Sequence, residues 1–435
     1  MLSRISRSVV FAVLVVFVPW QQCGAVPDPT AFPQPPNLKG LQVQMVDDAI
    51  ALGIHHAGIN VSMGPLFDVE AKPDSLPFKA SDGVEYHFSA VQIAALDRQV
   101  KPLSDAGVVI YAIILPYRTG NPAYDAWLVH PQARPDHKYS IPAFNTVSEA
   151  GRSHLRGAME FLAARYSGSA EHGRVWGWIV GNEANSHWLW YNRGLASLAE
   201  VVSDYEAAVR IVRDAVRTAS QHGRVYLSFD HHWQVSMPGI SEQEATSGRA
   251  FLDLFAKVAR ERGDFDWHVA THPYPDDLGN PRTWLDKDAP AREDAPHITF
   301  KNLEIMTQYM KRPELLWQGK PRRVILSEQG FHALDSPEGD ALQCAGFAYA
   351  WEKCLRCPGI DAFIWHRHVD HRDEGGLRLG LYERKPESVS EPGRKRPLWD
   401  LMKAAGTNDW PAAAAVYLPL TGLKSWDELP GENGK

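Results

Sequence analysis

The sequence has few cysteines, which excludes a fold built on disulfide bonds. Only four occur in 435 residues, and Cys23 lies in an N-terminal segment that we expect to be removed. The three that remain, Cys344, Cys354 and Cys357, are an odd number, so at least one thiol is free in an exported protein. No zinc-ribbon spacing is present, and a short-loop disulfide between Cys354 and Cys357 stays open. We interpret these cysteines as structural rather than redox-active.

The sequence also lacks an apolar run long enough to cross a membrane. The longest N-terminal run, residues 9–18, follows two arginines and precedes small residues at 23–25, which is the order of a secretory signal peptide. We therefore expect residues 1–25 to be a signal peptide and residues 26–36 to be a proline-rich leader. The mature protein is expected to be secreted or periplasmic, without membrane attachment.

A strong charge of one sign is absent too. Lys and Arg number 45 and Asp and Glu 52, a formal net charge of −7, which argues against nucleic acid or an anionic membrane as the main partner. No Gly-x-Gly-x-x-Gly follows any predicted strand, so a dinucleotide site is not expected. We predict no cofactor, no metal and a monomer. What the chain does have is 15 tryptophans, which sugar-binding proteins use as stacking platforms.

Predicted strands and helices alternate along the chain, which indicates an α/β fold with a parallel sheet. We expect a (β/α)8 TIM barrel over residues 37–406 and a C-terminal tail over 407–435. Only seven strands are evident, so the eighth must precede residue 54, where residues 37–40 are the only candidate. A doubly wound open sheet stays open as the alternative. The expected strands are 54–61, 108–115, 174–180, 224–229, 266–271, 323–327 and 360–365; the expected helices are 41–52, 90–106, 148–166, 195–220, 248–262, 300–309, 339–354 and 398–405.

Two of the predicted strands end in a carboxylate. Residues 175–180 form a buried-looking run followed by Asn182 and Glu183, and residues 323–327 lead to Glu328. In a (β/α)8 barrel the carboxyl ends of the strands carry the chemistry. Two carboxylates at that end are what a double-displacement glycosidase requires, so Glu183 and Glu328 are the candidate catalytic residues.

Polar and aromatic residues follow most of the other predicted strands at the same end of the barrel. We expect these residues to contact the substrate, together with the amide that precedes Glu183. The candidate substrate-binding residues are Asn60, Tyr117, Arg118, Asn182, Trp188, His231, His272, Tyr274, Trp365 and His366.

Four of these markers, taken in order, resemble a large family. The ordered set resembles the clan of retaining (β/α)8 glycoside hydrolases. Its markers are Asn182-Glu183 after a Trp-rich strand, His272 and Tyr274 after a later strand, Glu328 at the end of the next strand and Trp365 at the end of the last. That clan includes cellulases, mannanases, xylanases and β-galactosidases, and the similarity runs from about residue 54 to 368. The whole chain, with its ending at residues 366–371, also resembles secreted bacterial proteins of unassigned function.

The resemblance implies a role for each marker. Glu183 would be the acid/base and Glu328 the nucleophile, Asn182 would bond the sugar 2-hydroxyl, Tyr274 would orient Glu328, and Trp365 would floor the subsite of the reacting sugar. The expected function is hydrolysis of a poly- or oligosaccharide with retention.

Two other functions stay open. A non-catalytic carbohydrate-binding barrel would use the carboxylates only to bond hydroxyl groups. A metal-dependent TIM-barrel hydrolase would use the strand-end histidines, although the only histidine pair of the first predicted strand, His55-His56, stands at its beginning. Arginines at 118, 367, 372 and 378 could bind an anionic polysaccharide or pair with nearby acidic residues.

Overall fold

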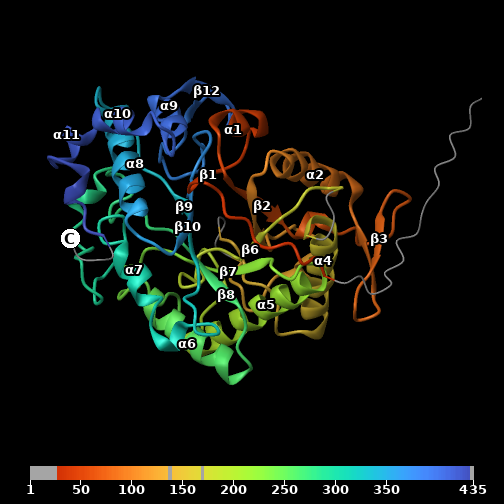
Figure 1. Ribbon diagram of the computed structural model, residues 1–435. Coiled ribbons are helices and arrows are strands. Elements are labelled where there is room, and N and C mark those ends of the chain that lie inside the picture. Colours follow the sequence, from red (N-terminus) through yellow and green to blue (C-terminus); the bar gives the residue numbers. More distant parts are fainter. Residues whose placement is uncertain (1–26, 136–139, 168–170, 432–435) are drawn as a thin grey trace, which may run out of the picture.

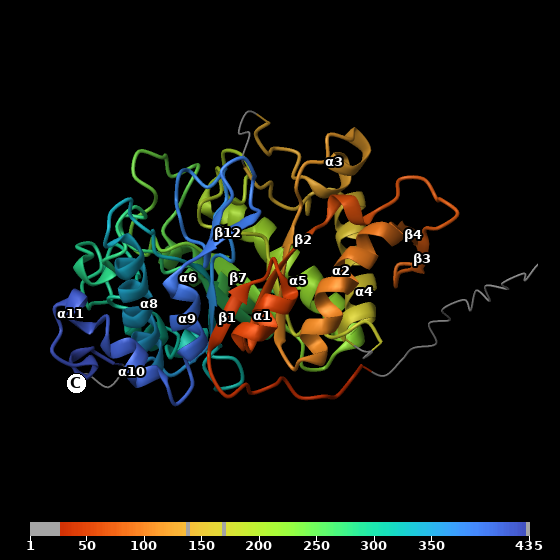
Figure 2. The same cartoon turned by 90° about the horizontal axis from the view of Figure 1, so that it is seen from above.

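The structure, a computed structural model, is a closed barrel of eight parallel strands surrounded by helices (Figures 1 and 2). It describes residues 27–135, 140–167 and 171–431, so the expected signal peptide lies outside the described residues. The expected barrel is confirmed. Its strands are β1 (Lys39–Gln42), β2 (His56–Ser62), β5 (Val109–Leu115), β6 (Gly177–Val180), β7 (Arg224–Phe229), β8 (Trp267–Thr271), β9 (Val324–Gln329) and β10 (Ile360–Trp365).

Strand β1 closes the barrel and is the strand that the apolar pattern indicated least clearly. Gly40 pairs with His56 on one side and with Ile364 on the other, which excludes an open doubly wound sheet. A Cβ atom at Gly40 would lie 2.9 Å from side-chain atoms of both neighbours, so this crossing needs glycine. Residues 41 and 42 belong to this strand, and the expectation of a helix from residue 41 is wrong there.

Helices surround the barrel (Figure 2). Helices α2, α4 and α5 lie on one side of the strands and α8 and α9 on the other. The helices are α1 (Val46–Leu52), α2 (Ala90–Asp105), α3 (Pro122–Leu128), α4 (Glu149–Ser167), α5 (Leu198–Ala219), α6 (Gly248–Glu261), α7 (Glu304–Tyr309), α8 (Gly339–Leu355), α9 (Pro397–Ala404), α10 (Trp410–Ala415) and α11 (Leu418–Thr421).

The apolar core has two layers, because side chains of a strand alternate between its two faces. One cluster fills the barrel interior and includes Ile325 and Ile364. The larger cluster lies between strands and helices and includes Leu326 and Trp365. This alternation decides which strand-end side chains can face the barrel mouth.

Two short hairpins and the C-terminal residues extend the barrel. The hairpin β3 (Leu76–Lys79) to β4 (Glu85–Phe88) packs on α4, where Phe88 stacks on Phe161 at 4.0 Å between ring centroids. The second hairpin joins β11 (Tyr382–Arg384) to β12 (Pro392–Lys395). Helices α10 and α11 cover α8, so the expected tail is packed structure over its described residues.

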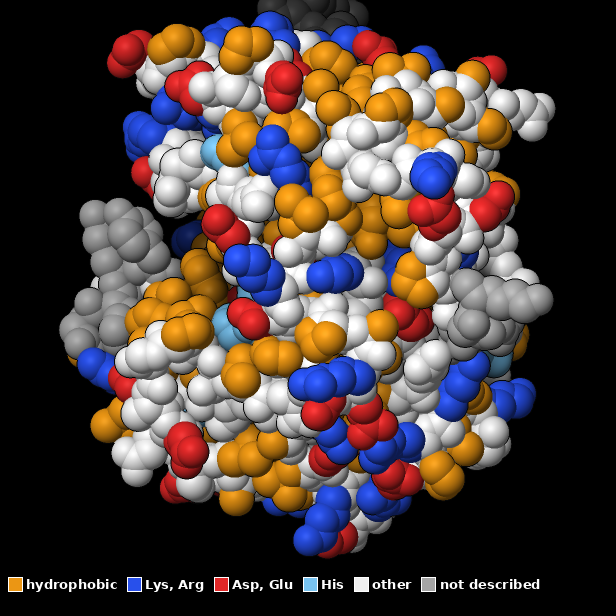
Figure 3. Space-filling model, turned by 90° about the vertical axis from the view of Figure 1, so that its left-hand side faces the viewer, with side chains coloured by type: hydrophobic (Ala, Val, Ile, Leu, Met, Phe, Trp, Pro, Cys, Tyr) orange, Lys and Arg blue, Asp and Glu red, His pale blue; other side chains and the backbone are white. Residues whose placement is uncertain are grey.

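The cysteines, the helices and the charged surface residues can be compared with what the composition indicated. Cys344, Cys354 and Cys357 are buried, and no disulfide joins them among the described residues. No helix of the described residues is long and apolar enough to cross a membrane. On the face drawn in Figure 3, acidic and basic side chains are interspersed with apolar ones.

Candidate active site

Glu183 lies in a sharp turn that directly follows β6. Its φ is +43°, a left-handed conformation that non-glycine residues adopt rarely, so the turn stores strain. Its backbone N–H donates to Ser228 Oγ at 2.9 Å, and the next N–H, of Ala184, donates to Ser228 O at 2.9 Å. The Tyr205 hydroxyl stabilises the same turn, because it donates to Val180 O and accepts from Ser228 N–H. The turn is therefore held to β7 and α5 on the side away from the barrel axis.

The carboxyl group of Glu183 is nearly enclosed. Its Oε1 lies 2.8 Å from His272 Nδ1, and the side chain is 10% exposed. Burial raises the pKa of Glu183 to about 6, and the negative charges of Asp230 and Glu328 add to the rise, whereas His272 opposes it. Burial is thus the main cause, and charge repulsion by Glu328 is a smaller one. A carboxyl group with this pKa can give up and regain a proton near neutral pH.

Glu328 reaches the barrel interior because β9 carries a β-bulge. Between Phe363 and Trp365 of β10 there is one residue, whereas between their partners Leu326 and Gln329 of β9 there are two, Ser327 and Glu328. The extra residue breaks the alternation of side chains between the two faces of β9, so the side chains of Ser327 and Glu328 both turn inward. Bulges commonly redirect a side chain beside an active site. Ser327 Oγ lies 3.0 Å from His272 Nε2, so one imidazole links the Glu183 turn to the bulge.

The carboxylate of Glu328 is surrounded by groups that favour its charge. Tyr274 donates its hydroxyl hydrogen to Oε1 at 3.2 Å, and the Gln42 amide donates to Oε2 at 3.2 Å. Burial alone would raise its pKa, but His366, His272 and the Gln42 hydrogen bond outweigh burial and hold the pKa of Glu328 below its usual 4.5. Glu328 is therefore ionised at a pH at which Glu183 still holds a proton.

A chain of hydrogen bonds continues from Glu328 through Gln42 to His366 and Glu374. Because the Gln42 amide nitrogen donates to Glu328, its Oε1 faces His366 Nδ1 at 2.6 Å and accepts from it. His366 Nε2 lies 2.9 Å from Glu374 Oε1, and the pKa of Glu374 falls to about 2 beside His366 and Arg367, despite its burial. Both ring nitrogens of His366 therefore face an acceptor, and the charge of His366 lowers the pKa of Glu328.

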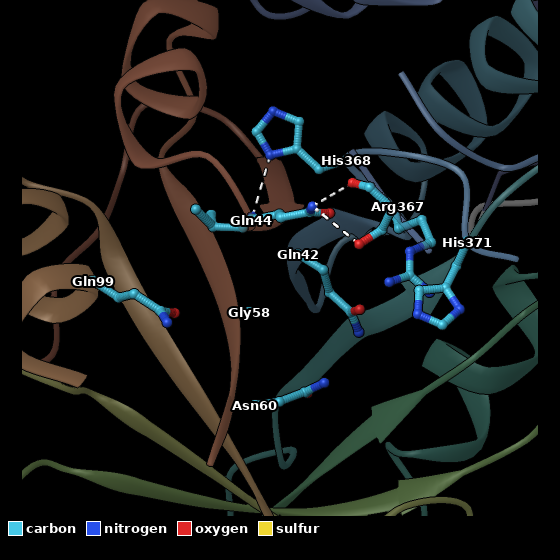
Figure 4. A pocket seen from close by; sticks show the side chains of 10 residues that line it. Gln42, Gln44, Gly58, Asn60, Gln99, Arg367, His368 and His371 are labelled. Carbon is cyan, nitrogen blue, oxygen red and sulfur yellow. Dashed lines mark hydrogen bonds between the residues drawn. The ribbon is translucent and has the colours of Figure 1, made fainter. Parts of the chain in front are cut away.

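A cavity of about 350 Å³ opens beside this chain (Figure 4). Side chains of Gln42 and Asn60 extend into it from neighbouring strands. Its polar lining consists mainly of neutral amides, since Arg367 is paired with Glu374. The lining residues are Gln42, Val43, Gln44, Gly58, Asn60, Gln99, Arg367, His368, His371 and Ser390.

The structure brings several predicted substrate-binding residues to this mouth. Asn60 is exposed in the cavity, and Tyr117 is 37% exposed and near enough to Glu328 for that charge to raise its pKa, after burial. Asn182 is half-buried beside Glu183, and its amide has no hydrogen bond to another described residue. Trp188 is half-buried just after the turn.

Other residues that were predicted to bind substrate contact other parts of the protein. Arg118 is exposed and donates to Ala133 O at 3.0 Å, which ties down its own loop. His231 stacks on His232 at 4.5 Å between ring centroids and contacts His297 rather than Glu183. Arg372 pairs with Asp373, and Arg378 donates to Ala333 O. The arginines are thus bound within the protein, which removes the reason to expect an anionic polysaccharide.

Trp365 does not line the mouth, and its expected role as a subsite floor is corrected here. The side chain is fully buried, donates Nε1–H to Leu379 O at 3.0 Å, and packs against Phe331 and Phe347. Alternation along β10 directs Ile364 and His366 inward and Trp365 toward α8. His366 occupies the position at the end of this strand that faces Glu328.

The strand-end histidines are dispersed, which weighs against one metal-hydrolase centre built from all of them. His272 bonds Glu183, and His366 bonds Gln42. His368 Nε2 lies 2.8 Å from Asp48 Oδ2, away from both carboxylates. His231 and His232 form a separate cluster with His297.

Sequence reasoning missed four residues of this site. Gln42 ends a strand with too few apolar residues to be recognised, and Ser327 turns inward only through the bulge. Glu374 lies in a Gly-rich loop where glutamates are ordinary. Asp230 could have been found, because it follows a predicted strand as Glu183 does. It accepts from Asn185 Nδ2 at 2.6 Å and fixes the residues after Glu183.

Comparisons with known proteins bear on the fold and on the family. A family 39 glycoside hydrolase from Bacteroides cellulosilyticus WH2 is 14% identical with a TM-score of 0.54, over 86% of this chain and 64% of its own, so this chain spans less than two thirds of its length. A β-glucosidase from Pyrococcus furiosus is 14% identical with a TM-score of 0.53, over 86% of both chains. A glucosidase from Croceicoccus marinus is 14% identical with a TM-score of 0.53, over 88% of this chain and 69% of its own.

At this identity the solved structures are similar in fold alone. Comparison with curated protein sequences gave no match. A family model described as a family of unknown function, DUF5722, matches residues 31–429. The chain therefore belongs to the DUF5722 family.

Proposed function

We propose that the protein is a retaining glycoside hydrolase with Glu183 as acid/base and Glu328 as nucleophile. The observation that carries the proposal is the opposite environment of the two carboxyl groups. Burial raises the pKa of Glu183 to about 6, while charge and hydrogen bonds hold the pKa of Glu328 below 4.5. Pairs of carboxyl groups whose pKa values are driven apart are the mark of an acid and a nucleophile in one site. The glycosidases of similar fold support glycoside hydrolysis as the activity.

The chemistry follows from these protonation states. Glu328 attacks the anomeric carbon while Glu183 gives its proton to the departing glycosidic oxygen. The glycosyl ester at Glu328 carries no charge, so the repulsion that raised the pKa of Glu183 disappears and Glu183 is more readily ionised. It then takes a proton from the water that cleaves the ester, and the anomeric configuration is retained.

The lining of the mouth supports a neutral saccharide as the substrate. The amides of Asn60 and Gln99 can donate to and accept from sugar hydroxyl groups. The arginines near the mouth already have partners within the protein. We therefore propose an uncharged oligo- or polysaccharide as substrate.

Activated aryl glycosides test the two roles separately. Glu328→Gln should abolish turnover on every substrate, because no nucleophile remains. Glu183→Gln should be milder on a substrate whose leaving group needs no proton. Azide should restore turnover in Glu183→Ala and give a glycosyl azide of retained configuration, a β-azide from a β-glycoside.

Glu70→Gln is the control, because Glu70 is exposed and outside the site. A screen of neutral saccharides and aryl glycosides must first give a cleaved substrate. Saccharide binding without turnover in the wild-type protein would favour a binding barrel. Wild-type turnover in Glu328→Gln would contradict the proposed nucleophile.

We also propose that the protein is exported and that its mature chain begins near Val26. The motivation is the order of basic, apolar and small residues in the first 25 positions. Intact-mass measurement of the exported form should show a loss of residues 1–25. A lipid-modified Cys23, or an unprocessed chain retained in the cell, would contradict this.

A further inference from the structure

Three histidines converge beside, but outside, the carboxyl pair. His231 and His232 follow β7, and His297 lies in the long connection between β8 and α7. The connection is held to the strand end by a backbone bridge between His232 and His297 and by Ile298 N–H donating to His231 O at 2.9 Å. One nitrogen of each of the three rings lies within 4.8 Å of the others.

Two of these rings are oriented by carboxylates. His232 Nδ1 lies 3.0 Å from Asp230 Oδ2, and His297 Nδ1 lies 2.8 Å from Asp276 Oδ1. Both carboxylates are themselves fixed, since Asp230 accepts from Asn185 and Asp276 accepts from the backbone N–H of residue 288. With Nδ1 of His297 engaged, its Nε2 is the nitrogen left for a ligand, and the Asp230 carboxylate lies beside Nδ1 of His232. A carboxylate behind an imidazole is the usual arrangement around a metal-binding histidine.

We propose that His231, His232 and His297 bind a divalent transition-metal ion such as Zn²⁺. Imidazoles are preferred by Zn²⁺, Co²⁺, Ni²⁺ and Cu²⁺ over Mg²⁺ and Ca²⁺. Coordination requires Zn–N distances of about 2.0–2.1 Å. Nitrogens spread over 4.8 Å must therefore draw together by roughly an ångström, which side-chain rotation can supply. A water molecule would complete the four-coordinate site.

The position of the site indicates what the ion does. It joins the end of β7 to the connection that carries His297, so it stabilises one wall of the barrel mouth. The same Asp230 that orients His232 also holds Asn185 in the segment that follows Glu183. The ion therefore joins two segments of one wall of the mouth, next to the turn that carries Glu183. The inference does not depend on the proposed glycosidase activity.

Cobalt is the probe that reports coordination directly. The metal-stripped full chain should bind one Co²⁺ and develop visible d–d absorption, which Zn²⁺ then displaces and Mg²⁺ does not. Zn²⁺ at a hundredfold excess over its dissociation constant should raise the melting temperature by about 3 °C. His297→Ala and His231→Ala should each lose the absorption and the shift.

The exposed His222 offers the matched control, and His222→Ala should bind Co²⁺ as the wild type does. Near-UV circular dichroism checks that each variant is folded, and His297→Gln replaces His297→Ala if the latter is not. Absence of Co²⁺ absorption in the wild type, or its persistence in both folded cluster variants, would overturn the proposal. The three imidazoles would then be a stacked, metal-free cluster.

Discussion

At the scale of single residues, the site depends on how differently two carboxyl groups are solvated and paired. Glu183 is held by one imidazole in a buried place, and burial dominates its pKa. Glu328 is half-buried, accepts from Tyr274 and Gln42, and faces the charge of His366. Burial favours the neutral form of a carboxyl group, whereas donors and positive charge favour the ionised form. The same residue type thus obtains two roles.

These directions predict the pH dependence of turnover. Glu328 must be ionised, so activity falls as the pH drops below the lowered pKa of Glu328, under 4.5. Glu183 must be protonated, so activity falls as the pH rises through about 6. We expect a bell-shaped kcat/KM profile with its maximum between about 4.5 and 6.

His272→Gln should move both limbs of this profile to higher pH. The His272 hydrogen bond and charge lower the pKa of Glu183, so their loss raises that pKa and shifts the alkaline limb to higher pH. Loss of the same charge raises the pKa of Glu328 and shifts the acidic limb upward as well. His222→Gln, at an exposed position, should leave both limbs in place. An alkaline limb that moves to lower pH would contradict the assignment of Glu183.

At the scale of elements, the site is assembled where helix α5 meets strands β6 and β7. The hydroxyl of Tyr205 bridges Val180 O at 2.8 Å and Ser228 N at 3.0 Å, below the Glu183 turn. Ser228 in turn accepts the Glu183 N–H. The strained φ of Glu183 persists because these neighbours hold both ends of the turn. The Tyr205 side chain of α5 therefore helps to position Glu183 through Ser228, without contacting Glu183 itself.

Tyr205→Phe should reduce both stability and turnover. It leaves a buried carbonyl and a buried N–H without partners, at a cost of about 1–3 kcal/mol in the free energy of unfolding. Since Ser228 loses its support, kcat on an activated aryl glycoside should also fall. Denaturant unfolding and steady-state kinetics on one preparation measure both effects.

Tyr124→Phe is the comparison variant, because the Tyr124 hydroxyl also bridges two backbone groups, those of residues 67 and 69. That bridge is more exposed and remote from the carboxyl groups, so the stability loss should be smaller and kcat unchanged. Equal loss of kcat in both variants would show that Tyr205 acts only through general stability.

At the scale of the whole molecule, the two ends of the described chain complete the barrel. Strand β1 pairs with β10, and helices α10 and α11 cover α8. Trp410 is buried against Trp351 and Phe347 and donates Nε1–H to Glu352 Oε1 at 2.7 Å. The domain boundary expected at residue 406 stays a prediction, but residues beyond it contribute to the core.

Trp410→Ala should therefore lower the free energy of unfolding by about 3–5 kcal/mol, the usual cost of removing a large buried aromatic side chain. Val416→Ala in the same segment should change it by less than about 0.5 kcal/mol, because Val416 is 69% exposed. Thermal or denaturant unfolding compares the two. A Trp410→Ala variant as stable as the wild type would show that the C-terminal helices are dispensable.

The order of buried runs and their polar ends by itself determined an alternating α/β fold with a parallel sheet, and it identified both candidate catalytic residues. Runs of apolar residues separated by helical periodicity specify parallel strands, and parallel strands place their carboxyl ends together. Seven of the strands, and the ends that carry Glu183 and Glu328, follow from that pattern. The seven-strand count left closure open, since the pattern of β1 is too short to be recognised.

Only the tertiary structure decided closure of the barrel, the direction of each side chain and the partners of each charge. Strand β1 exists because it pairs on both sides, and those hydrogen bonds are made by backbone atoms that every residue shares. The β-bulge of β9 turns Glu328 toward the barrel interior, whereas regular alternation along β10 turns Trp365 away from it. One residue inserted into a strand reverses the face to which the following side chains point. The partners of Glu328, Gln42 and Tyr274, lie 286 and 54 residues away along the chain. Local sequence cannot encode such pairings, because they depend on which distant segments the closed barrel places side by side.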